Sequence, residues 1–454
     1  MPFVSLNPAT NELVKEYPYW DESQLEKALS EVSVATPMWA NTPLSERCEH
    51  VRRLGLLLLR RRDQLAGLIS LEMGKLIGEA RAEVEKCATV CGYYADNGPA
   101  FLADEVIESD AGRSFVAHQP LGTVLAVMPW NFPIWQVFRF LVPALVAGNT
   151  GVLKHASNVP QCALAIEAVV RDAGLPNGVF RSLMVSSAQV AGLIEDKRVH
   201  ALTLTGSESA GRQVAATAGA NLKKTVLELG GSDPFIVLED ADLDWAVQQG
   251  VASRFLNAGQ SCVAAKRFIV LESVADEFVA KFRVAVEALK PGDPVDVDTT
   301  LAPMARIDLR DELHQQVQAS VAKGAVAVTG CAPYEGVGAY YQASILDGIK
   351  PGMSAWDEEF FGPVAIVIRA KDEAEAIKIA NGSDFGLAGS VWTQDSERGE
   401  RVARQVQSGA VFVNGMVKSD PRLPFGGVKN SGYGRELCHH GMLEFVNQKA
   451  IWLK

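Results

Sequence analysis

The sequence is poor in cysteine: its 454 residues include only seven, at scattered positions. An odd and sparse set in a long chain excludes a scaffold built on disulfides. A zinc site is equally unexpected, because Cys87 and Cys91 have no second Cys/His pair, and His439 and His440 are adjacent instead of spaced as helix ligands. We therefore expect no structural metal.

The sequence also lacks long hydrophobic runs and an excess of positive charge. The N-terminus has no basic segment followed by an apolar one, so we expect no signal peptide. The longest apolar run, near residues 140–153, is interrupted by Pro143 and Gly148 and is too short to span a bilayer. Lys and Arg number 43 against 54 Asp and Glu, a net charge of −11. Nucleic acid and anionic membranes bind concentrated basic residues, so neither is an expected partner, and we expect a cytoplasmic protein.

What the sequence does contain is a regular alternation of strand-like and helix-like segments. Residues 21–105 are predicted to be mostly helical. Apolar runs then predict strands at 122–129, 150–154, 179–184, 199–205 and 224–229, with helical patterns between them. This alternation predicts βαβ units and a parallel sheet, whose ligands bind at the carboxyl ends of the strands. The pattern restarts after residue 231, which predicts a second α/β unit and a cleft between the two.

One cysteine has a distinctive context. Cys262 follows Gly259-Gln260-Ser261, a small polar loop just beyond a helical pattern. Such a loop permits ionisation and substrate access, and a thiolate is the strongest side-chain nucleophile near neutral pH. The alternative, which we expect for the other six cysteines, is a small buried hydrophobic side chain.

Two further polar residues follow buried strands. Glu228 lies in an otherwise apolar strand, where it is either a solvent-facing edge residue or a desolvated carboxyl with a raised pKa, suited to act as a general base. Asn131 lies between the prolines of Pro129-Trp130-Asn131-Phe132-Pro133. Its amide either donates a hydrogen bond to a developing oxyanion or belongs to a structural turn.

A phosphate-binding glycine motif of the form G-x-G-x-x-G is missing from the chain. In its place, Thr205-Gly206-Ser207 stands where a predicted strand meets a predicted helix. A helix N-terminus that opens with Gly-Ser can hold a pyrophosphate.

Taken together, these segments resemble the NAD(P)-dependent aldehyde dehydrogenases, and among them most closely the succinate-semialdehyde dehydrogenases. The matching segments stand in family order along the whole chain: Asn7–Thr10, Pro129–Pro133, Lys154, Thr205–Ser207, Glu228–Gly231, Gly259–Cys262, Glu359–Pro363 and Pro424–Glu436. The resemblance implies an α/β fold of two Rossmann-like parallel-sheet lobes plus a small β oligomerisation element. The implied division is 1–102 and 120–230 for cofactor binding, 231–436 for catalysis, and 103–119 with 437–454 for self-association to a dimer or tetramer.

The resemblance also implies a role for individual residues. Cys262 is the expected nucleophile, Glu228 the general base and Asn131 the oxyanion donor. The expected cofactor-binding residues are Trp130, Lys154, Ser157, Gly206, Ser207, Glu359 and Phe361. The implied reaction oxidises an aldehyde to the carboxylic acid through a thiohemiacetal and a thioester on the cysteine, with NADP and/or NAD as cofactor.

Ser157 bears on the choice between these cofactors. Many relatives that prefer NAD carry Glu at this place, three residues after Lys154. Ser157 has no charge that would repel a 2′-phosphate, and its hydroxyl can donate to one, so we expect NADP to be accepted. The alternative is that a contact has merely been lost and both cofactors bind weakly.

Arg139 is the informative residue for the substrate. It lies on an apolar helical segment, where semialdehyde-oxidising relatives also carry Arg, and a guanidinium can hold a carboxylate bidentately. The alternative is an internal salt bridge. A second Arg of some relatives is absent here, since Leu256 occupies its place, and Ser261, Ser419 and Arg422 are further candidates for substrate contacts.

These residues predict the oxidation of succinate semialdehyde to succinate. The alternatives are another aldehyde (lactaldehyde, glutarate semialdehyde or a broad range of aliphatic aldehydes) and, more remotely, a cysteine esterase or hydrolase that needs no cofactor.

Overall fold

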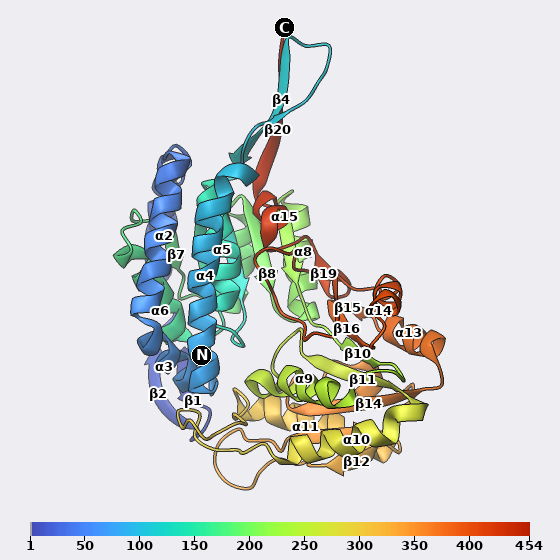
Figure 1. Ribbon diagram of the computed structural model, residues 1–454. Coiled ribbons are helices and arrows are strands. Elements are labelled where there is room, and N and C mark those ends of the chain that lie inside the picture. The colour runs from blue at the N-terminus through green and yellow to red at the C-terminus, as the bar shows by residue number, and fades with distance from the viewer. Residues whose placement is uncertain (1) are drawn as a thin grey trace.

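The structure is a computed structural model in which residues 2–454 are described. Figure 1 shows two α/β units, with the first half of the chain in the upper one, and a narrow β arm that projects from it and carries the C-terminus at its tip. The fold class expected from the sequence, two units built on largely parallel sheets, is confirmed. No helix in residues 2–454 is both long and apolar enough to cross a membrane.

The first unit is built on a six-stranded sheet in the order β19-β9-β8-β5-β6-β7. Its strands are β5 (Thr123–Met128), β6 (Thr150–His155), β7 (Phe180–Ser182), β8 (Ala201–Thr205), β9 (Lys224–Glu228) and β19 (Gly432–Tyr433). Strands β5 to β9 pair in parallel, as the alternating pattern predicts. Strand β19 is antiparallel to β9 and places Gly432 opposite Glu228, so the chain returns to this sheet after completing the second unit.

Helices cover this sheet and form the N-terminal part of the unit. They are α1 (Glu22–Ala40), α2 (Leu44–Arg60), α3 (Arg62–Met73), α4 (Ile77–Phe101), α5 (Trp135–Ala147), α6 (Pro160–Asp172), α7 (Val190–Glu195) and α8 (Glu208–Ala220), with a 3-10 turn η1 (Ser187–Gln189) and the hairpin β1 (Phe3–Asn7) and β2 (Glu12–Tyr17). Helix α1 begins with a capping box between Asp21 and Gln24. Helix α4 turns Val84, Cys87 and Cys91 toward the core at spacings of three and four residues, which buries one face of the helix.

The second unit is built on a seven-stranded sheet in the order β12-β13-β14-β11-β10-β16-β17, parallel except for the edge strand β12. Its strands are β10 (Asp233–Val237), β11 (Ala265–Leu271), β12 (Val326–Thr329), β13 (Ser344–Asp347), β14 (Val364–Ala370), β16 (Ala388–Trp392) and β17 (Ala410–Val413). Its helices are α9 (Leu243–Phe255), η2 (Leu256–Gly259), α10 (Glu272–Glu287), α11 (Ile307–Ala322), α12 (Ser354–Asp357), α13 (Glu373–Asn381) and α14 (Ser396–Ala403). Every residue of β11 is buried, because helices cover both faces of a parallel sheet.

The remaining strands form two small sheets. Strands β15 (Phe385–Gly386) and β18 (Val428–Lys429) pair with each other. Strands β3 (Glu105–Val106), β4 (Arg113–Pro120) and β20 (Val446–Leu453) form the projecting arm, in which β20 runs antiparallel to β4 from Val446 opposite Pro120 to Leu453 opposite Arg113. Helix α15 (Cys438–Leu443) precedes β20. The division of the chain into a cofactor-binding domain, a catalytic domain and an oligomerisation element stays a prediction.

Candidate active site

Two cavities meet at Cys262. The first, of about 340 Å³, opens at the carboxyl ends of β5, β8 and β9, where ligands of parallel sheets bind. Its walls include Trp130, Asn131, Gly206, Ser207, Gly230, Glu359 and Phe361. The second, of about 420 Å³, lies between α4, α5 and the segment that follows β17. Cys262 and Gln136 line both cavities, so the thiol stands where one chamber passes into the other.

A strained backbone turn and the buried side chain of Lys266 hold the Cys262 loop in place. Asn257 and Ala258 have φ values of 55° and 52°, a region that side chains rarely adopt. The Lys266 ammonium, 0 % exposed, donates to the carbonyl oxygens of Ser261 at 2.9 Å and Cys262 at 2.7 Å. Charge-assisted hydrogen bonds from the Lys266 ammonium therefore hold the loop that carries the thiol.

The surroundings of Cys262 have opposing effects on the pKa of its thiol. Burial raises the pKa of the thiol to about 11, while the positive charges of Arg139 and Lys266 act to lower it. A thiolate is the reactive form, so these two cations favour the ionised nucleophile. The other six cysteines are all buried, and Cys262 alone among the seven is partly accessible.

Asn131 follows β5 in a loop that several groups hold rigid. Its amide nitrogen donates to the carbonyl oxygen of Gln260 at 3.1 Å, which brings it beside the cysteine loop. The Glu83 carboxylate accepts hydrogen bonds from the backbone N–H groups of Ile134 and Trp135 at the start of α5. Glu83 also pairs with the buried ammonium of Lys75 at 2.5 Å. The amide that is expected to meet an oxyanion is thus preorganised.

We expect the variant Asn131→Ala to lose kcat and to keep its affinity for the cofactor. Removing one oxyanion donor typically lowers kcat by about 100- to 1000-fold, because the donor acts on charge that develops only in the transition state. Steady-state kinetics measures this, and a change in KM with an unaltered kcat would show that Asn131 binds substrate instead.

Glu228 ends β9 and is 2 % exposed. Neither of its carboxyl oxygens has a hydrogen-bond partner within the described part of the chain. Burial, and next the negative charge of nearby Glu436, raise the pKa of Glu228 well above its usual value, since both disfavour the ionised form of Glu228. Of the two interpretations of its sequence context, the desolvated carboxyl is the one that the structure shows. Glu228 lines neither cavity wall, so its side chain must turn toward Cys262 in order to reach a reacting water.

The expected cofactor residues fall into two groups. Trp130, Gly206, Ser207, Glu359 and Phe361 come together around the first cavity, where the rings of Trp130 and Phe361 meet edge to face at 5.8 Å. Lys154 and Ser157 are not among its walls. The Lys154 ammonium donates to the Ser187 hydroxyl at 3.2 Å, and Ser157 is exposed just beyond β6.

The first cavity fits a nicotinamide dinucleotide on three features of this chain. Ser207 caps the 13-residue helix α8, whose N-terminal N–H groups favour a pyrophosphate. Gly230 leaves its cavity wall open, because a Cβ there would lie 2.3 Å from the Glu359 carboxylate. Glu359 accepts from the Gly231 N–H at 3.1 Å and pairs with Lys266 at 3.0 Å, so the lysine beneath the cysteine also anchors this carboxylate.

Three of the four residues predicted to bind substrate lie around the second cavity. Ser261, Ser419 and Arg139 all line it. The Arg139 guanidinium, however, forms an ion pair with Glu436, donates to the Thr205 hydroxyl at 3.2 Å and stacks over the Phe425 ring. The structure thus shows the internal salt bridge, the alternative considered for this arginine. Arg422, also considered for the substrate, pairs with Asp420.

Two lysines of the site, Lys266 and Lys86, are not among the residues predicted from the sequence. Lys266 had a detectable signal, because Lys266 and Arg267 interrupt the otherwise apolar segment 264–271, and such cations are unusual there unless they are paired. Lys86 had none: on the amphipathic α4, a lysine is normally part of the solvated face. Only the packing of α4 against α5 shows that Lys86 enters the wall of the second cavity.

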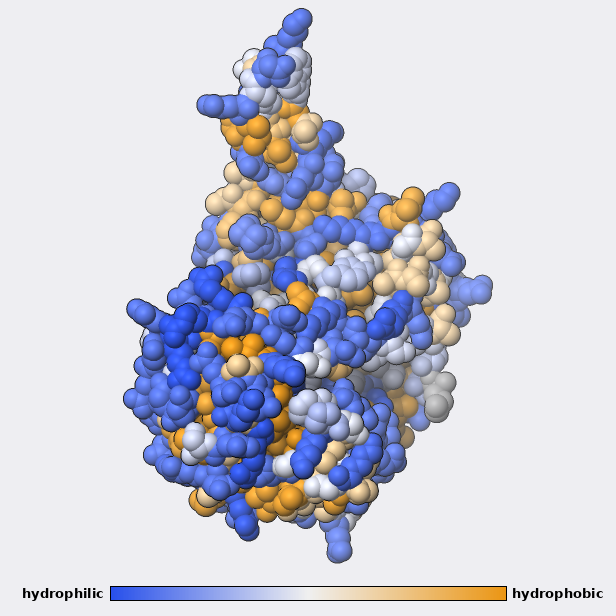
Figure 2. Space-filling view, turned by 90° about the vertical axis from the view of Figure 1, so that its right-hand side faces the viewer, coloured by the Kyte–Doolittle hydropathy of each residue, from blue (hydrophilic) through white to orange (hydrophobic). Residues whose placement is uncertain are grey.

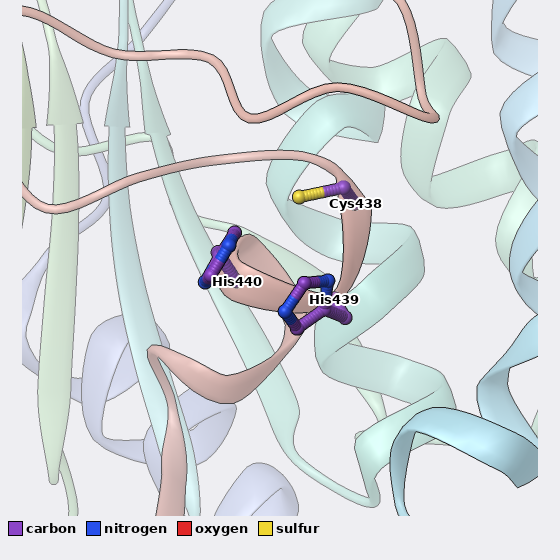
Figure 3. A group of neighbouring side chains, drawn as sticks. All are labelled: Cys438, His439 and His440. Carbon is purple, nitrogen blue, oxygen red and sulfur yellow. The ribbon is translucent and has the colours of Figure 1, made fainter.

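One group of possible metal ligands stands apart from both cavities. The ligand atoms of Cys438, His439 and His440 lie within 4.8 Å of one another, and Figure 3 shows the three side chains on the first turn of α15. The two imidazole rings are exposed and lie 3.8 Å apart, whereas the thiol is buried. None of the three lines either cavity.

The fold, the cysteine at the meeting point of two cavities and the order of the motifs define a class of enzyme. The chain belongs to the aldehyde dehydrogenase family, whose model matches residues 2–451. It is 48% identical, over the whole of both chains, to a probable NADP(+) succinate-semialdehyde dehydrogenase of Synechocystis sp.. It is 47% identical to the NAD(P)+ succinate semialdehyde dehydrogenase Sad of Escherichia coli, over 99% of this chain and 97% of the relative.

A solved structure shows the same likeness. The crystal structure of succinic semialdehyde dehydrogenase from Streptococcus pyogenes in complex with NADP+ superposes with a TM-score of 0.98 at 38% identity, over 99% of each chain. The family predicted from the sequence motifs is confirmed.

Proposed function

We propose that this protein oxidises succinate semialdehyde to succinate with NADP+ as the hydride acceptor. The observation that carries the proposal is the second cavity, in which an apolar chamber beside the nucleophile also contains cationic side chains. A neutral aliphatic aldehyde gives no reason for cations there, whereas an aldehyde that bears a carboxylate does. The relatives from Synechocystis, Escherichia coli and Streptococcus, which are named as succinate-semialdehyde dehydrogenases, support the same substrate.

The chemistry begins with Cys262. Its sulfur attacks the aldehyde carbon and forms a C–S bond, while the carbonyl π electrons move to the oxygen. The Asn131 amide donates to this oxyanion, so the negative charge that develops on the oxygen is stabilised. When the oxyanion collapses, the hydrogen on the carbon leaves as hydride, which the nicotinamide accepts when the cofactor is bound. Cys262 then carries a thioester.

Hydrolysis of the thioester restores the enzyme. Glu228 removes a proton from a water molecule, whose oxygen attacks the thioester carbon, and the C–S bond breaks to release the carboxylic acid and the Cys262 thiolate. The pKa of Glu228, raised by burial, suits a group that must take up a proton here and lose it again in every cycle. The movement of the Glu228 side chain toward the cavity therefore contributes to the rate of thioester hydrolysis.

A panel of aldehydes tests the function. The purified enzyme is assayed for nicotinamide reduction with succinate semialdehyde, glutarate semialdehyde, lactaldehyde and butanal, each with NADP+ and with NAD+. We expect the highest kcat/KM for succinate semialdehyde with NADP+. A higher value for lactaldehyde or butanal would overturn the substrate, and ester hydrolysis without any nicotinamide reduction would favour the cofactor-free cysteine hydrolase.

Ser157 makes the cofactor preference testable by mutation. We expect Ser157→Glu to lower kcat/KM for NADP+ about tenfold or more, because a carboxylate at this exposed position would repel a 2′-phosphate. Activity with NAD+ should be kept or improved. The control variant Ser157→Gln adds similar volume without charge, so an equal loss with both variants would show that size, not charge, is responsible.

The arm supplies a surface for self-association. Val106, Trp452 and Leu453 on its strands and Ile107 just after β3 are exposed apolar side chains, and Figure 2 shows hydrophobic surface on the projecting arm. Exposed strand edges and apolar patches of this kind usually pair with another chain. We therefore propose a dimer or tetramer in which copies pack through the arm. Sedimentation equilibrium of the intact chain checks this, and a monomer at all concentrations would contradict it.

A further inference from the structure

The second cavity has a largely apolar wall that is interrupted by a few charged groups. Its apolar part includes Phe132, Trp135, Leu256, Val263, Met416 and Phe425. The charged residues are Glu79, Glu83, Lys86, Arg139 and Lys418. An anion that enters this chamber needs a cation that is not already paired with a protein carboxylate. The existing ion pairs of each charged group therefore decide which cation can bind the anion.

Most of these charged groups already have partners. Arg139 is paired with Glu436, and Glu83 is paired with Lys75 and with the N-terminus of α5. Glu79 accepts from the Asn257 N–H at 3.1 Å, and burial raises its pKa to about 7. Lys418 is exposed to solvent, where its charge is screened.

Lys86 is different, because it is half-buried and forms no ion pair with a carboxylate of residues 2–454. Its ammonium lies 4.4 Å from the centre of the Trp135 ring and donates to the Ser419 hydroxyl at 2.5 Å. An ammonium has three donors, and this serine uses only one of them. The remaining donors are free for an anionic ligand.

The charge of Lys86 is poised for such a ligand. Burial, and next the nearby Arg139, lower the pKa of Lys86 to about 8, while Glu83, Cys87 and Asp420 act weakly in the opposite direction. Arg139 also acts on the thiol of Cys262, so Lys86 and the nucleophile lie within the field of one guanidinium. A carboxylate beside Lys86 would restore the stability of its charged form.

We propose that Lys86 binds the carboxylate of the semialdehyde substrate, with Ser419 positioning its ammonium, while the aldehyde end lies at Cys262. The inference rests on the proposed function and makes Lys86 its specificity-determining residue. Arg139 then serves the site indirectly, by neutralising Glu436 next to Glu228 and by favouring the thiolate.

The test compares an anionic with a neutral aldehyde of equal carbon number. We expect Lys86→Met to lower kcat/KM for succinate semialdehyde by roughly 10- to 100-fold, the range for a lost charge-assisted hydrogen bond, and to change kcat/KM for butanal less than about threefold. Lys86→Arg should recover part of the loss. The matched control Lys197→Met removes an exposed lysine that lines neither cavity and should leave both values within about threefold.

The pH profile adds a readout that a structural role would not move. In the wild type, the ratio of kcat/KM for succinate semialdehyde to that for butanal should fall as the pH rises through about 8, because Lys86 loses its charge. Ionisation of Cys262 affects both substrates and cancels in the ratio. In Lys86→Met this fall should disappear.

The outcomes separate the two proposals. A wild type that does not prefer succinate semialdehyde would overturn the proposed function. A wild type that does prefer it, together with a Lys86→Met variant that keeps the preference or loses both substrates equally, would overturn the role of Lys86 alone.

Discussion

Cys262→Ala is expected to abolish aldehyde oxidation, with a loss on the order of 10⁴-fold or more in kcat, because no other side chain at the meeting point of the cavities can form the thioester. Binding of NADP+, measured by quenching of tryptophan fluorescence, should persist, since the walls of the first cavity are unchanged. Removing a single sulfur from a partly accessible position leaves the packing of both sheets intact.

The matched control is Cys48→Ala, which removes the same atom from a buried position on α2. We expect this variant to keep nearly full activity, with a modest loss of stability from the small cavity that it leaves. Substantial oxidation by Cys262→Ala would end the covalent mechanism, and the mechanism would also fail if the Cys48 variant lost activity to the same extent while remaining folded.

Glu228→Gln is expected to separate the two halves of the reaction. Acyl transfer to Cys262 does not need this carboxylate, so one equivalent of reduced cofactor per active site should still form rapidly. Hydrolysis does need it, and the steady-state rate should fall by about 10²- to 10⁴-fold, the usual contribution of a general base. Rapid-mixing measurements of nicotinamide reduction show the burst, and mass spectrometry detects the acylated enzyme.

In the wild type the same residue should produce a pH dependence of defined sign. Because burial and Glu436 raise the pKa of Glu228, its ionised form, which is the base, becomes more abundant as the pH rises. Thioester hydrolysis should therefore accelerate with increasing pH, and this dependence should vanish in Glu228→Gln.

The control Glu312→Gln makes the same exchange at an exposed carboxyl that lines the first cavity, and should retain normal turnover. If Glu228→Gln lost the burst together with the turnover, the carboxylate would act before the thioester forms, as the group that deprotonates Cys262.

Much of the fold could be predicted from the local pattern. The apolar runs at 122–129, 150–154, 199–205 and 224–229 correspond to β5, β6, β8 and β9, because a strand buried on both faces needs a continuous apolar sequence. The return of residues 432–433 to the first sheet could not be predicted from local pattern, since a two-residue strand carries no periodic signal. Its pairing depends on the complete second unit.

The sequence by itself determined the family and the chemical groups of the site. Short motifs such as Gly259–Cys262 and Pro129–Pro133 can be recognised in the sequence, because local backbone geometry and reactivity depend on neighbouring residues. Tertiary structure alone decided which charged side chains pair with each other. Arg139 was free to meet either a substrate or a protein carboxylate until folding placed Glu436, 297 residues further along the chain, against it. Lys86 became a half-buried cation in the wall of the second cavity only when α4 packed beside α5, because burial and ion pairing depend on contacts between segments that are distant in sequence.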